Sequence, residues 1–469
     1  MLPGSLFLDH RQTLQQVSFC VHPGEWVVLL GANGSGKSTL ARLANGLLLP
    51  NEGEVVADGI SSWQHDRLLE LRKRVGLVSH DADNQIVSTT VFDEVAFGPQ
   101  NLGWEPERIY AAVRGALAQV GLAGDEFEKR DPNSLSGGEK QRVVIAALMA
   151  MEPGYLVLDE PTAMLDPVAR SQVLRSIALA KQAGHGILQI THLLKEASFA
   201  DRVLVLHNGK LVYDGAPEGI LGNQAALTAY GLAARPHKKV PLAAAALDSA
   251  AAFDSAAAPR LSLNKVSFAY PDTVSCKPAL ENIDLTLAGG ECLLLVGPSG
   301  SGKSTLLTLA AGLMQPTEGE VLLKGSPPKP GQVGLVFQQP ETQLFAQTLC
   351  EDILFGPKNL GFALSEHGNT EKALIDKVLN AVGLEPGRFK HRSPFSLSGG
   401  EARRAAIATI LALQTDFLLL DEPTAGLDAR GRAFVYELVQ DLIAAGKGII
   451  IATHNPELFA SLATSKREL

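Results

Sequence analysis

The stretch Gly31-Ala-Asn-Gly-Ser-Gly-Lys-Ser-Thr39 decides the fold, because it fits the pattern Gly-x-x-x-x-Gly-Lys-Ser/Thr and recurs as Gly297-Pro-Ser-Gly-Ser-Gly-Lys-Ser-Thr305. Each stretch precedes a helical pattern and follows an apolar run that predicts a buried strand, Trp26–Leu30 or Cys292–Val296. Glycines let backbone N–H groups surround phosphate oxygens, and the N-terminus of the following helix favours an anion. The alternative, a glycine-rich turn before a helix, is disfavoured by the double occurrence in this context. The sequence therefore predicts two sites for a nucleoside triphosphate.

The side chains of the two loops have separate expected roles. Lys37 and Lys303 would reach the β- and γ-phosphates, and Ser38 and Ser304 would bind Mg²⁺. The ATP-binding residues expected in the loops are Gly31, Asn33, Gly34, Gly36, Lys37, Ser38 and Thr39, together with Gly297, Ser299, Gly300, Gly302, Lys303, Ser304 and Thr305.

Length and composition restrict the class of protein. The chain has 469 residues, enough for two to four domains at about 150 residues each. A formal charge of −9 argues against a nucleic-acid partner, which normally needs a basic surface. The four cysteines lack metal-like spacing, and no apolar run approaches the ~20 residues that cross a bilayer. We therefore expect a cytoplasmic protein without a transmembrane segment, whose membrane role, if any, depends on a partner.

Internal repetition defines the architecture. Leu-Ser-Gly-Gly-Glu at 135–139 recurs at 397–401, and Asp-Glu-Pro-Thr-Ala at 159–163 recurs at 421–425. Thr-His at 191–192 recurs with the same offset of 262 residues. The sequence predicts two copies of one domain, at 1–231 and 260–469, separated by an alanine-rich linker at 232–259.

Each copy alternates apolar runs with helical patterns, which predicts an α/β fold with a mixed sheet. Continuous apolar runs at Val27–Leu30, Tyr155–Leu158 and Gly186–Ile190 predict strands buried on both faces. Amphipathic patterns at Ile109–Val120 and Lys372–Val382 predict an inserted helical subdomain in each copy. Residues 201–215 predict a hairpin with an Asn-Gly turn, for which the second copy shows no counterpart.

Paired acids follow the strand before each Pro-Thr-Ala. Asp159 and Asp421 would orient Mg²⁺, and Glu160 and Glu422 would act as general bases toward the attacking water. A strand-end acid pair alone often only caps the next helix, but here each pair follows a phosphate loop. The histidines that come after another buried strand, His192 and His454, are expected within reach of the γ-phosphate.

The repeated Leu-Ser-Gly-Gly-Glu supplies a second anion-binding helix start in each copy. With the other motifs, it resembles the nucleotide-binding domains of ABC ATPases, so the expected fold is two tandem P-loop NTPase domains. The resemblance implies head-to-tail closure, with each ATP lying between one copy's phosphate loop and the other copy's serine. The residues implied to contact ATP in this way are Ser136, Gly137, Gly138, Ser398, Gly399 and Gly400.

A second pattern narrows the resemblance. The copies contain Asp83-Asn-Gln85 and Glu341-Thr-Gln343, and each continues into Phe-Gly-Pro-x-Asn-Leu-Gly, at 97–103 and 355–361. This is similar to the ATPases of energy-coupling factor transporters (CbiO/EcfA-like), here fused in one chain, which take up vitamins or cobalt and nickel ions.

That resemblance implies two partners at the cytoplasmic face of the membrane: a transmembrane scaffold (EcfT-like) subunit and a substrate-binding membrane subunit. Coupling helices of the scaffold would enter a groove near Asp93, Glu94, Glu351 and Asp352. From the residues alone, these acids could equally form a solvated face.

The two copies differ around their loops. Gln338 stands where the family has its Mg²⁺-sensing glutamine, whereas the first copy has His80, a poorer ligand for this hard ion. Tyr270 stands where the family stacks adenine, whereas the first copy has Asp9 or His10. We predict that the Lys303/Glu422 site does most of the hydrolysis; the alternative is that neither difference matters.

Two other functions fit a tandem ATPase. One is a soluble protein acting on ribosomes, although such proteins usually have charged linkers and basic surfaces. The other is the ATPase of a sugar-type ABC importer, against which the Phe-Gly-Pro-x-Asn-Leu-Gly segments argue.

Overall fold

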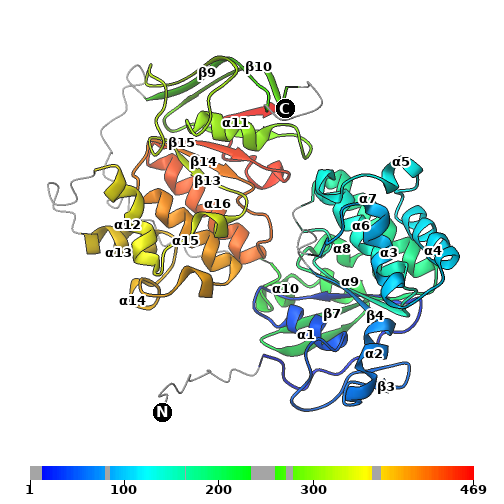
Figure 1. Cartoon of the computed structure of the whole chain (residues 1–469). Helices are drawn as coiled ribbons and strands as arrows, with labels where there is room; N and C mark the ends of the chain where they lie inside the picture. Colours follow the sequence, from blue (N-terminus) through cyan, green and yellow to red (C-terminus); the bar gives the residue numbers. More distant parts are fainter. Residues whose placement is uncertain (1–12, 80–84, 164, 234–258, 271–277, 362–370) are drawn as a thin grey trace, which may run out of the picture. The chain divides into compact units, whose positions relative to one another are not determined.

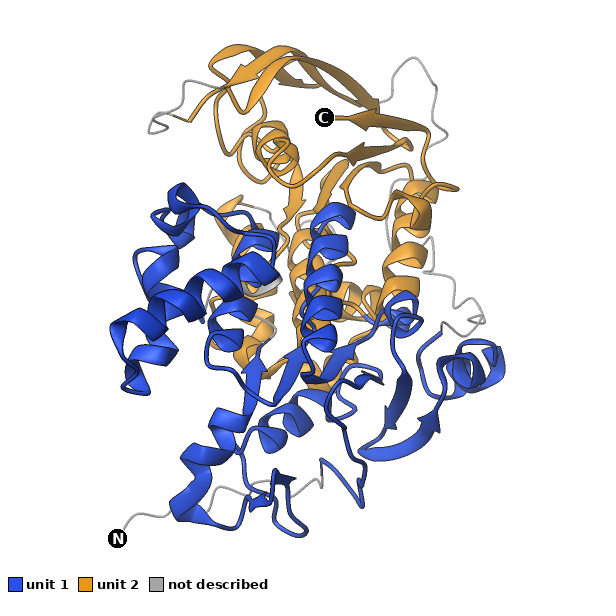
Figure 2. Cartoon of the chain, turned by 90° about the vertical axis from the view of Figure 1, so that its right-hand side faces the viewer, with its two compact units in different colours: residues 1–235, 428–430 blue, residues 236–427, 431–469 orange. Residues whose placement is uncertain are grey.

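The computed structural model describes residues 13–79, 85–163, 165–233, 259–270, 278–361 and 371–469. The chain divides into two compact units, with residues 1–235 and 428–430 in unit 1 and residues 236–427 and 431–469 in unit 2 (Figure 2). Most of the predicted linker, 232–259, lies outside the described residues and stays a prediction.

Unit 1 is built on a six-stranded sheet with strand order β4-β5-β6-β1-β7-β8. Figure 1 labels β4 and β7 of this sheet. Neighbours from β4 to β7 pair in parallel, and β8 pairs antiparallel with β7. The strands are β1 (Trp26–Leu30), β4 (Val75–Val78), β5 (Tyr155–Asp159), β6 (Gly186–Thr191), β7 (Arg202–His207) and β8 (Lys210–Gly215), with a separate small hairpin of β2 (Val56–Ala57) and β3 (Ile60–Ser61).

The helices of unit 1 include the predicted insertion, which spans α3 to α5. They are α1 (Lys37–Ala44), α2 (Leu68–Arg74), α3 (Val91–Asn101), α4 (Pro106–Gln119), α5 (Asp125–Glu128), α6 (Gly137–Met149), α7 (Pro167–Gln182), α8 (Leu194–Ala197), α9 (Pro217–Leu221) and α10 (Gln224–Ala229).

Unit 2 contains a five-stranded parallel sheet with strand order β13-β14-β15-β11-β16 and a separate antiparallel sheet with strand order β10-β9-β12. The strands are β9 (Arg260–Phe268), β10 (Leu280–Ala288), β11 (Cys292–Val296), β12 (Glu318–Leu323), β13 (Gly334–Val336), β14 (Phe417–Asp421), β15 (Gly448–Ala452) and β16 (Ser465–Glu468). The helices are α11 (Lys303–Ala310), α12 (Leu349–Asn359), α13 (Glu371–Ala381), α14 (Pro386–Phe389), α15 (Gly399–Leu411) and α16 (Ala429–Ala444).

The expected elements are present in these units. The three predicted strands of the first copy fall within β1, β5 and β6, and the two predicted amphipathic helices correspond to α4 and α13. The predicted Asn-Gly turn joins β7 to β8, and both of its residues have positive φ, 47° at Asn208 and 76° at Gly209. That geometry matches the right-handed twist of a hairpin.

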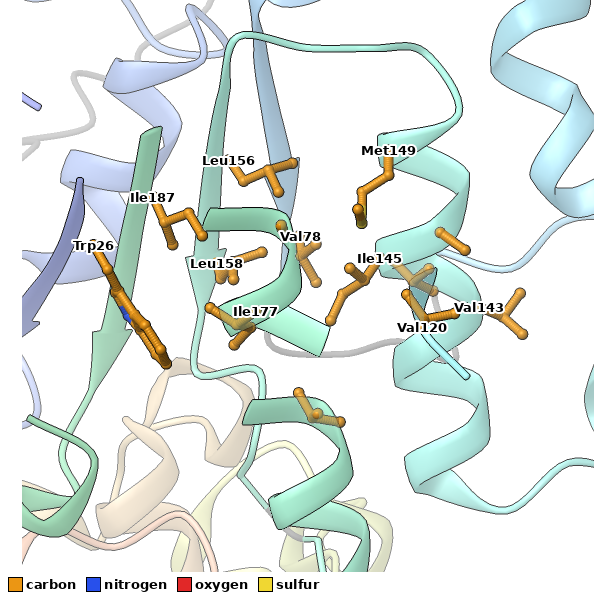
Figure 3. Packing of buried hydrophobic residues seen from close by; sticks show 14 of the residues in the cluster. Trp26, Val78, Val120, Val143, Ile145, Met149, Leu156, Leu158, Ile177 and Ile187 are labelled. Atoms are coloured by element: carbon orange, nitrogen blue, oxygen red, sulfur yellow. The ribbon is translucent and has the colours of Figure 1, made fainter. Parts of the chain in front are cut away.

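Central strands bury both of their faces, which is why they are continuously apolar. In β1, Trp26, Val28 and Leu30 pack into the cluster with α6, while Val27 and Leu29 pack into another cluster with Leu40 of α1. Figure 3 shows the first of these two clusters. In this view Ile145 points toward the sheet, and Leu158 lies between Ile145 and Trp26. Such a two-sided core holds the carboxyl ends of the strands, and the loops that follow them, in fixed places.

Within the described residues, no helix combines the length and the apolar character needed to cross a membrane.

Candidate functional site

The two phosphate loops connect β1 to α1 and β11 to α11. Gly34 and Gly36 have φ of 77° and 104°, and the matching Gly300 and Gly302 have φ of 81° and 92°. A side chain at these positions would be strained, so glycine is required for the loop to curl. The predicted loop residues therefore lie together ahead of a helix N-terminus in each unit.

The loop lysines lie inside these curls. Lys37 Nζ donates to the carbonyl oxygens of Gly31 at 2.8 Å and Ala32 at 3.1 Å. Lys303 Nζ makes the matching contacts with Gly297 at 2.8 Å and Pro298 at 2.9 Å. Burial lowers the pKa of Lys37, while the nearby carboxylates of Glu160 and Asp159 act in the opposite direction. Each buried ammonium group is thus held within a loop suited to phosphate.

The paired acids end the strands next to these loops. Asp159 and Asp421 are the last residues of β5 and β14 and are buried. The following glutamates adopt the left-handed region, with φ of 52° at Glu160 and 45° at Glu422, which is unusual for a residue with a side chain. Their backbone N–H groups donate to Ile190 and Ala452 on the neighbouring strands, both at 2.9 Å. The same strained turn in both units aims each second carboxylate in a set direction.

Each glutamate meets its histidine. Glu160 Oε2 lies 3.1 Å from His192 Nδ1, and Glu422 Oε1 lies 3.2 Å from His454 Nε2. Burial raises the pKa of Glu422 to about 7. A carboxylate with such a pKa is well matched to accepting a proton near neutral pH. The structure therefore brings together the acid and the histidine that the sequence predicted as catalytic.

Two of the residues expected to hold Mg²⁺ in unit 2, Ser304 and Asp421, are adjacent. Burial raises the pKa of Asp421, and a hydrogen bond from Ser304 together with the charge of Lys303 opposes that shift. Hydroxyl and carboxylate oxygens are ligands that Mg²⁺ accepts, and phosphate and water oxygens complete its shell in nucleotide sites. Gln338, the third expected ligand, is half-buried just after β13. The donor set thus fits a magnesium ion bound together with a nucleotide.

The serines of the two Leu-Ser-Gly-Gly-Glu motifs cap helices. Ser136 and Ser398 are the N-caps of α6 and α15, and each accepts from the backbone N–H three residues on, at Glu139 and Glu401. Both glutamates reach back to the serine N–H at 2.9 Å, which completes a capping box. Ser136, Gly137, Ser398 and Gly399 are exposed, whereas Gly400 is half-buried and Gly138 is buried. Each helix start therefore exposes its cap serine and its first glycine, and the serine hydroxyl also donates to the capping glutamate, at 2.7 Å in unit 1 and 2.9 Å in unit 2.

Tyr270 lies beside the second phosphate loop. Its hydroxyl is 3.0 Å from Thr305 Oγ1, in the first turn of α11, and its ring packs edge-on against Phe268. The ring is about half exposed, as an aromatic that stacks a base must be. The counterparts in the first copy, Asp9 and His10, lie outside the described residues, and so do His80 and Asp83.

Two of the four acids expected near the docking groove for the scaffold have a structural role that the sequence did not reveal. Glu94 and Asp352 are buried. Glu94 Oε2 accepts from the N–H groups of Val87 and Ser88 at 2.9 and 2.8 Å. Asp352 accepts from the two matching N–H groups at 3.2 and 3.1 Å. The idea of a solvated acidic face is wrong for these two residues, because each carboxylate ties down the preceding loop.

The shared Asp/Glu-x-Gln pattern also has a structural explanation. Gln85 Oε1 accepts from Ser79 N at 2.9 Å, and Gln85 Nε2 donates to Leu77 O at 3.4 Å. Gln343 makes the same pair of contacts with Phe337 and Leu335. Each glutamine therefore hydrogen-bonds the backbone at the end of the strand that precedes the expected Mg²⁺-sensing position.

This combination of a parallel sheet, a lysine-bearing phosphate loop and a strand-end acid pair defines a P-loop NTPase, and it occurs once in each unit. Comparison with known sequences identifies the family. The family model described as ABC transporter matches residues 14–163 and 280–425.

Individual relatives match along nearly the whole chain. An ABC transporter ATP-binding protein of Bifidobacterium longum is 36% identical over 493 residues, covering 95% of this chain and 61% of the relative. YkoD of Bacillus subtilis, named for HMP/thiamine import, is 33% identical over 497 residues, covering 97% of this chain and 86% of the relative. The chain thus spans less than two thirds of the length of the Bifidobacterium protein.

A solved structure, of ribosome-bound archaeal Pelota and ABCE1, matches with a TM-score of 0.65 and 21% identity, covering 95% of this chain and 72% of that one. At this identity the match supports the tandem fold alone. This chain belongs to the ABC transporter family and is an ATPase with two ABC domains in tandem.

Proposed function

We propose that this ATPase energises an energy-coupling factor importer for a vitamin or a transition-metal ion. Support comes from the Phe-Gly-Pro-x-Asn-Leu-Gly segment in each copy and from the import function in the name of the Bacillus relative. In this proposal the chain sits peripherally on the cytoplasmic face of the membrane. It contacts a transmembrane scaffold (EcfT-like) subunit, which in turn holds a substrate-binding membrane subunit.

Packing and backbone conformation explain the glycines at the second and last positions of the Phe-Gly-Pro-x-Asn-Leu-Gly segment, but they do not explain its phenylalanine. Gly98 and Gly356 face Met151 and Leu413 too closely to carry a larger side chain without a shift. The segment's last glycine in each copy has positive φ, 70° or 68°, and follows the end of the helix. The phenylalanine that opens each segment has no such role, because it is 51% exposed in both units.

Exposed apolar side chains gather beside this phenylalanine, and they carry the proposal. In unit 2, Phe345 and Phe355 are 57% and 51% exposed, and their rings meet edge to face with centroids 4.7 Å apart. In unit 1 the matching residues are Val87 and Phe97, 66% and 51% exposed. Exposed apolar clusters of this kind mark interaction sites. We call each pair the apolar platform of its unit.

The buried acids stabilise these platforms. Glu94 accepts from the N–H of Val87, and Asp352 accepts from the N–H of Phe345, so each carboxylate positions one member of a platform. The docking surface is therefore apolar, which suits an amphipathic coupling helix from the scaffold. The expected docking groove near the four acids is kept in this proposal, with the apolar platforms as its contact surface.

Within each ATP site, the residues divide the chemistry of hydrolysis. The lysine of the loop exchanges its carbonyl contacts for phosphate oxygens when ATP binds. Ser304, Asp421 and Gln338 would hold Mg²⁺, which supplies charge neutralisation on the phosphates. Glu422 accepts a proton from the water that attacks the γ-phosphorus, and His454 holds that carboxylate in place. ADP and inorganic phosphate leave.

The first copy has the matching residues. Ser38 and Asp159 would hold Mg²⁺, Glu160 would accept the proton, and His192 would position Glu160. In this proposal the two copies close head to tail on two ATP molecules. Ser136 completes the site of the second copy, and Ser398 completes the site of the first. That part of the proposal rests on the sequence resemblance alone.

The test is to identify what co-purifies with the tagged full chain from detergent-solubilised membranes. We expect a small membrane scaffold and a substrate-binding membrane protein, both lost in the Phe97→Ser/Phe355→Ser chain and retained in Phe199→Ser, which changes another exposed phenylalanine. Recovery with ribosomes, or with a sugar importer that uses a periplasmic binding protein, would overturn the proposal.

A further inference from the structure

A buried arginine links three segments of the second ATPase site. Arg403 lies in the first half of α15 and is 4% exposed. Its Nη2 donates to Gln338 O at 2.7 Å, and its Nη1 donates to Glu422 O at 3.3 Å and to Ala425 O. These acceptors belong to the loop after β13, the acid pair after β14 and the turn that follows that pair.

Arginine is suited to this position for physical reasons. Its guanidinium keeps its charge and holds five N–H donors in a rigid plane, so it can satisfy several carbonyl oxygens at once. Charge-assisted hydrogen bonds in a buried place are stronger than neutral ones. The charge of Arg403 also opposes the effect of burial on Glu422 by lowering the pKa of that carboxyl group.

We propose that Arg403 is a positioning residue of the second ATPase site, which holds the Gln338 loop and the Glu422 turn as one unit. Through this residue, a movement of the loop that carries the glutamine is passed to the turn that carries the base. The inference concerns the ATPase reaction itself and is independent of which partner or cargo the chain serves.

The first copy has a glutamine in this place. Gln141 is 262 residues before Arg403, lies at the same turn of α6 and is 5% exposed. Among the described residues, its Nε2 has no hydrogen-bond partner. A single neutral amide cannot make three charge-assisted contacts. The described residues show this tie between loop and base in the second copy, and it favours that copy as the faster site independently of the difference between His80 and Gln338.

The experiment compares Arg403→Gln, which installs the first-copy residue, with Arg403→Lys and with the matched control Gln141→Ala, all in the full chain. Steady-state ATP hydrolysis gives kcat and KM, and hydrogen exchange reports on residues 334–343 and on residues 76–79, which match 334–337. We expect Arg403→Gln to lower kcat about tenfold with KM changed less than about twofold, since small misplacements of catalytic groups have effects of this size. Exchange rises in 334–343 and stays unchanged in 76–79.

Arg403→Lys keeps the charge and part of the donor set, so we expect its kcat to lie between those of wild type and Arg403→Gln. If Arg403→Gln does not fold, Arg403→Lys replaces it as the test variant. Gln141→Ala leaves kcat within about twofold. The proposal is overturned if Arg403→Lys matches wild type in both kcat and exchange, or if Gln141→Ala lowers kcat as much as Arg403→Gln. It is also overturned if exchange rises along all of α15 while KM rises, which indicates a general packing role.

Discussion

Glu422 Oε1 lies 3.2 Å from His454 Nε2, and the base and the histidine come from the ends of two neighbouring parallel strands. The first copy repeats the contact with the other ring nitrogen, since His192 Nδ1 lies 3.1 Å from Glu160 Oε2. A carboxylate held by a histidine beside a phosphate loop is the arrangement on which the catalytic assignments depend.

The first prediction concerns that histidine. His454→Ala should lower kcat at least about tenfold, because the carboxylate of Glu422 loses the group that orients it. The KM for ATP should change less than about threefold, since the phosphate loop is intact. Steady-state kinetics of the full chain measures both, with the exposed His391→Ala as the control. A raised KM with unchanged kcat would assign the histidine to binding instead.

The second prediction concerns pH and stability. Glu196 is buried in unit 1 and accepts from Thr162 at 2.5 Å and Gln189 at 2.8 Å, and burial raises its pKa. An acid with a raised pKa in the folded state contributes stability that is fully present below its unfolded pKa of about 4.3 and is lost as the pH rises through the folded pKa.

The free energy of unfolding of wild type, minus that of Glu196→Gln, should therefore fall as the pH rises. Denaturant titrations from about pH 5 to about pH 8 measure it. Glu218→Gln, at an exposed position of α9, is the control and should show a constant difference. A constant difference for Glu196→Gln as well would contradict the prediction.

The third prediction contrasts two glycines. Gly302 has a φ of 92°, and a methyl group there would press on the Ala279 carbonyl oxygen, so Gly302→Ala should destabilise unit 2 by about 1–3 kcal/mol and abolish ATP binding at its loop. Gly115 lies inside α4 with open space around it, so Gly115→Ala should stabilise unit 1 by about 0.5–1 kcal/mol. Thermal unfolding measures both changes. Equal effects of the two substitutions would show that backbone conformation is not the cause.

The fourth prediction separates the buried acid from the apolar platform. Asp352→Asn keeps the oxygen that accepts from Phe345 and Ala346, whereas Asp352→Ala leaves both N–H groups without it. Only the alanine variant should fail to co-purify with the proposed membrane scaffold. If the asparagine variant loses it equally, the buried charge of Asp352 supports the platform, and the acceptor oxygen alone does not.

The sequence predicted the motifs and the order of elements well, because phosphate loops, acid pairs and capped helices are formed by residues close together in the chain. Ser136 with Glu139 is an example, since the capping box spans three residues. The role of Arg403 could not be predicted in this way, because Gln338 lies 65 residues away and only the sheet topology brings them together. Burial of Asp352 was missed for a similar reason, since an acid in the first turn of a helix usually faces solvent. The unequal residues His80 and Gln338 remain a prediction from the sequence.

The most direct test of the account is the ATPase activity of two single variants of the full chain in the proposed membrane complex. Each variant replaces a proposed general base by its amide, which keeps the shape of the side chain and removes its basicity. We predict that Glu422→Gln lowers steady-state turnover at least about tenfold and Glu160→Gln less than about threefold. Equal losses in the two variants would contradict the claim that the second copy is the faster site.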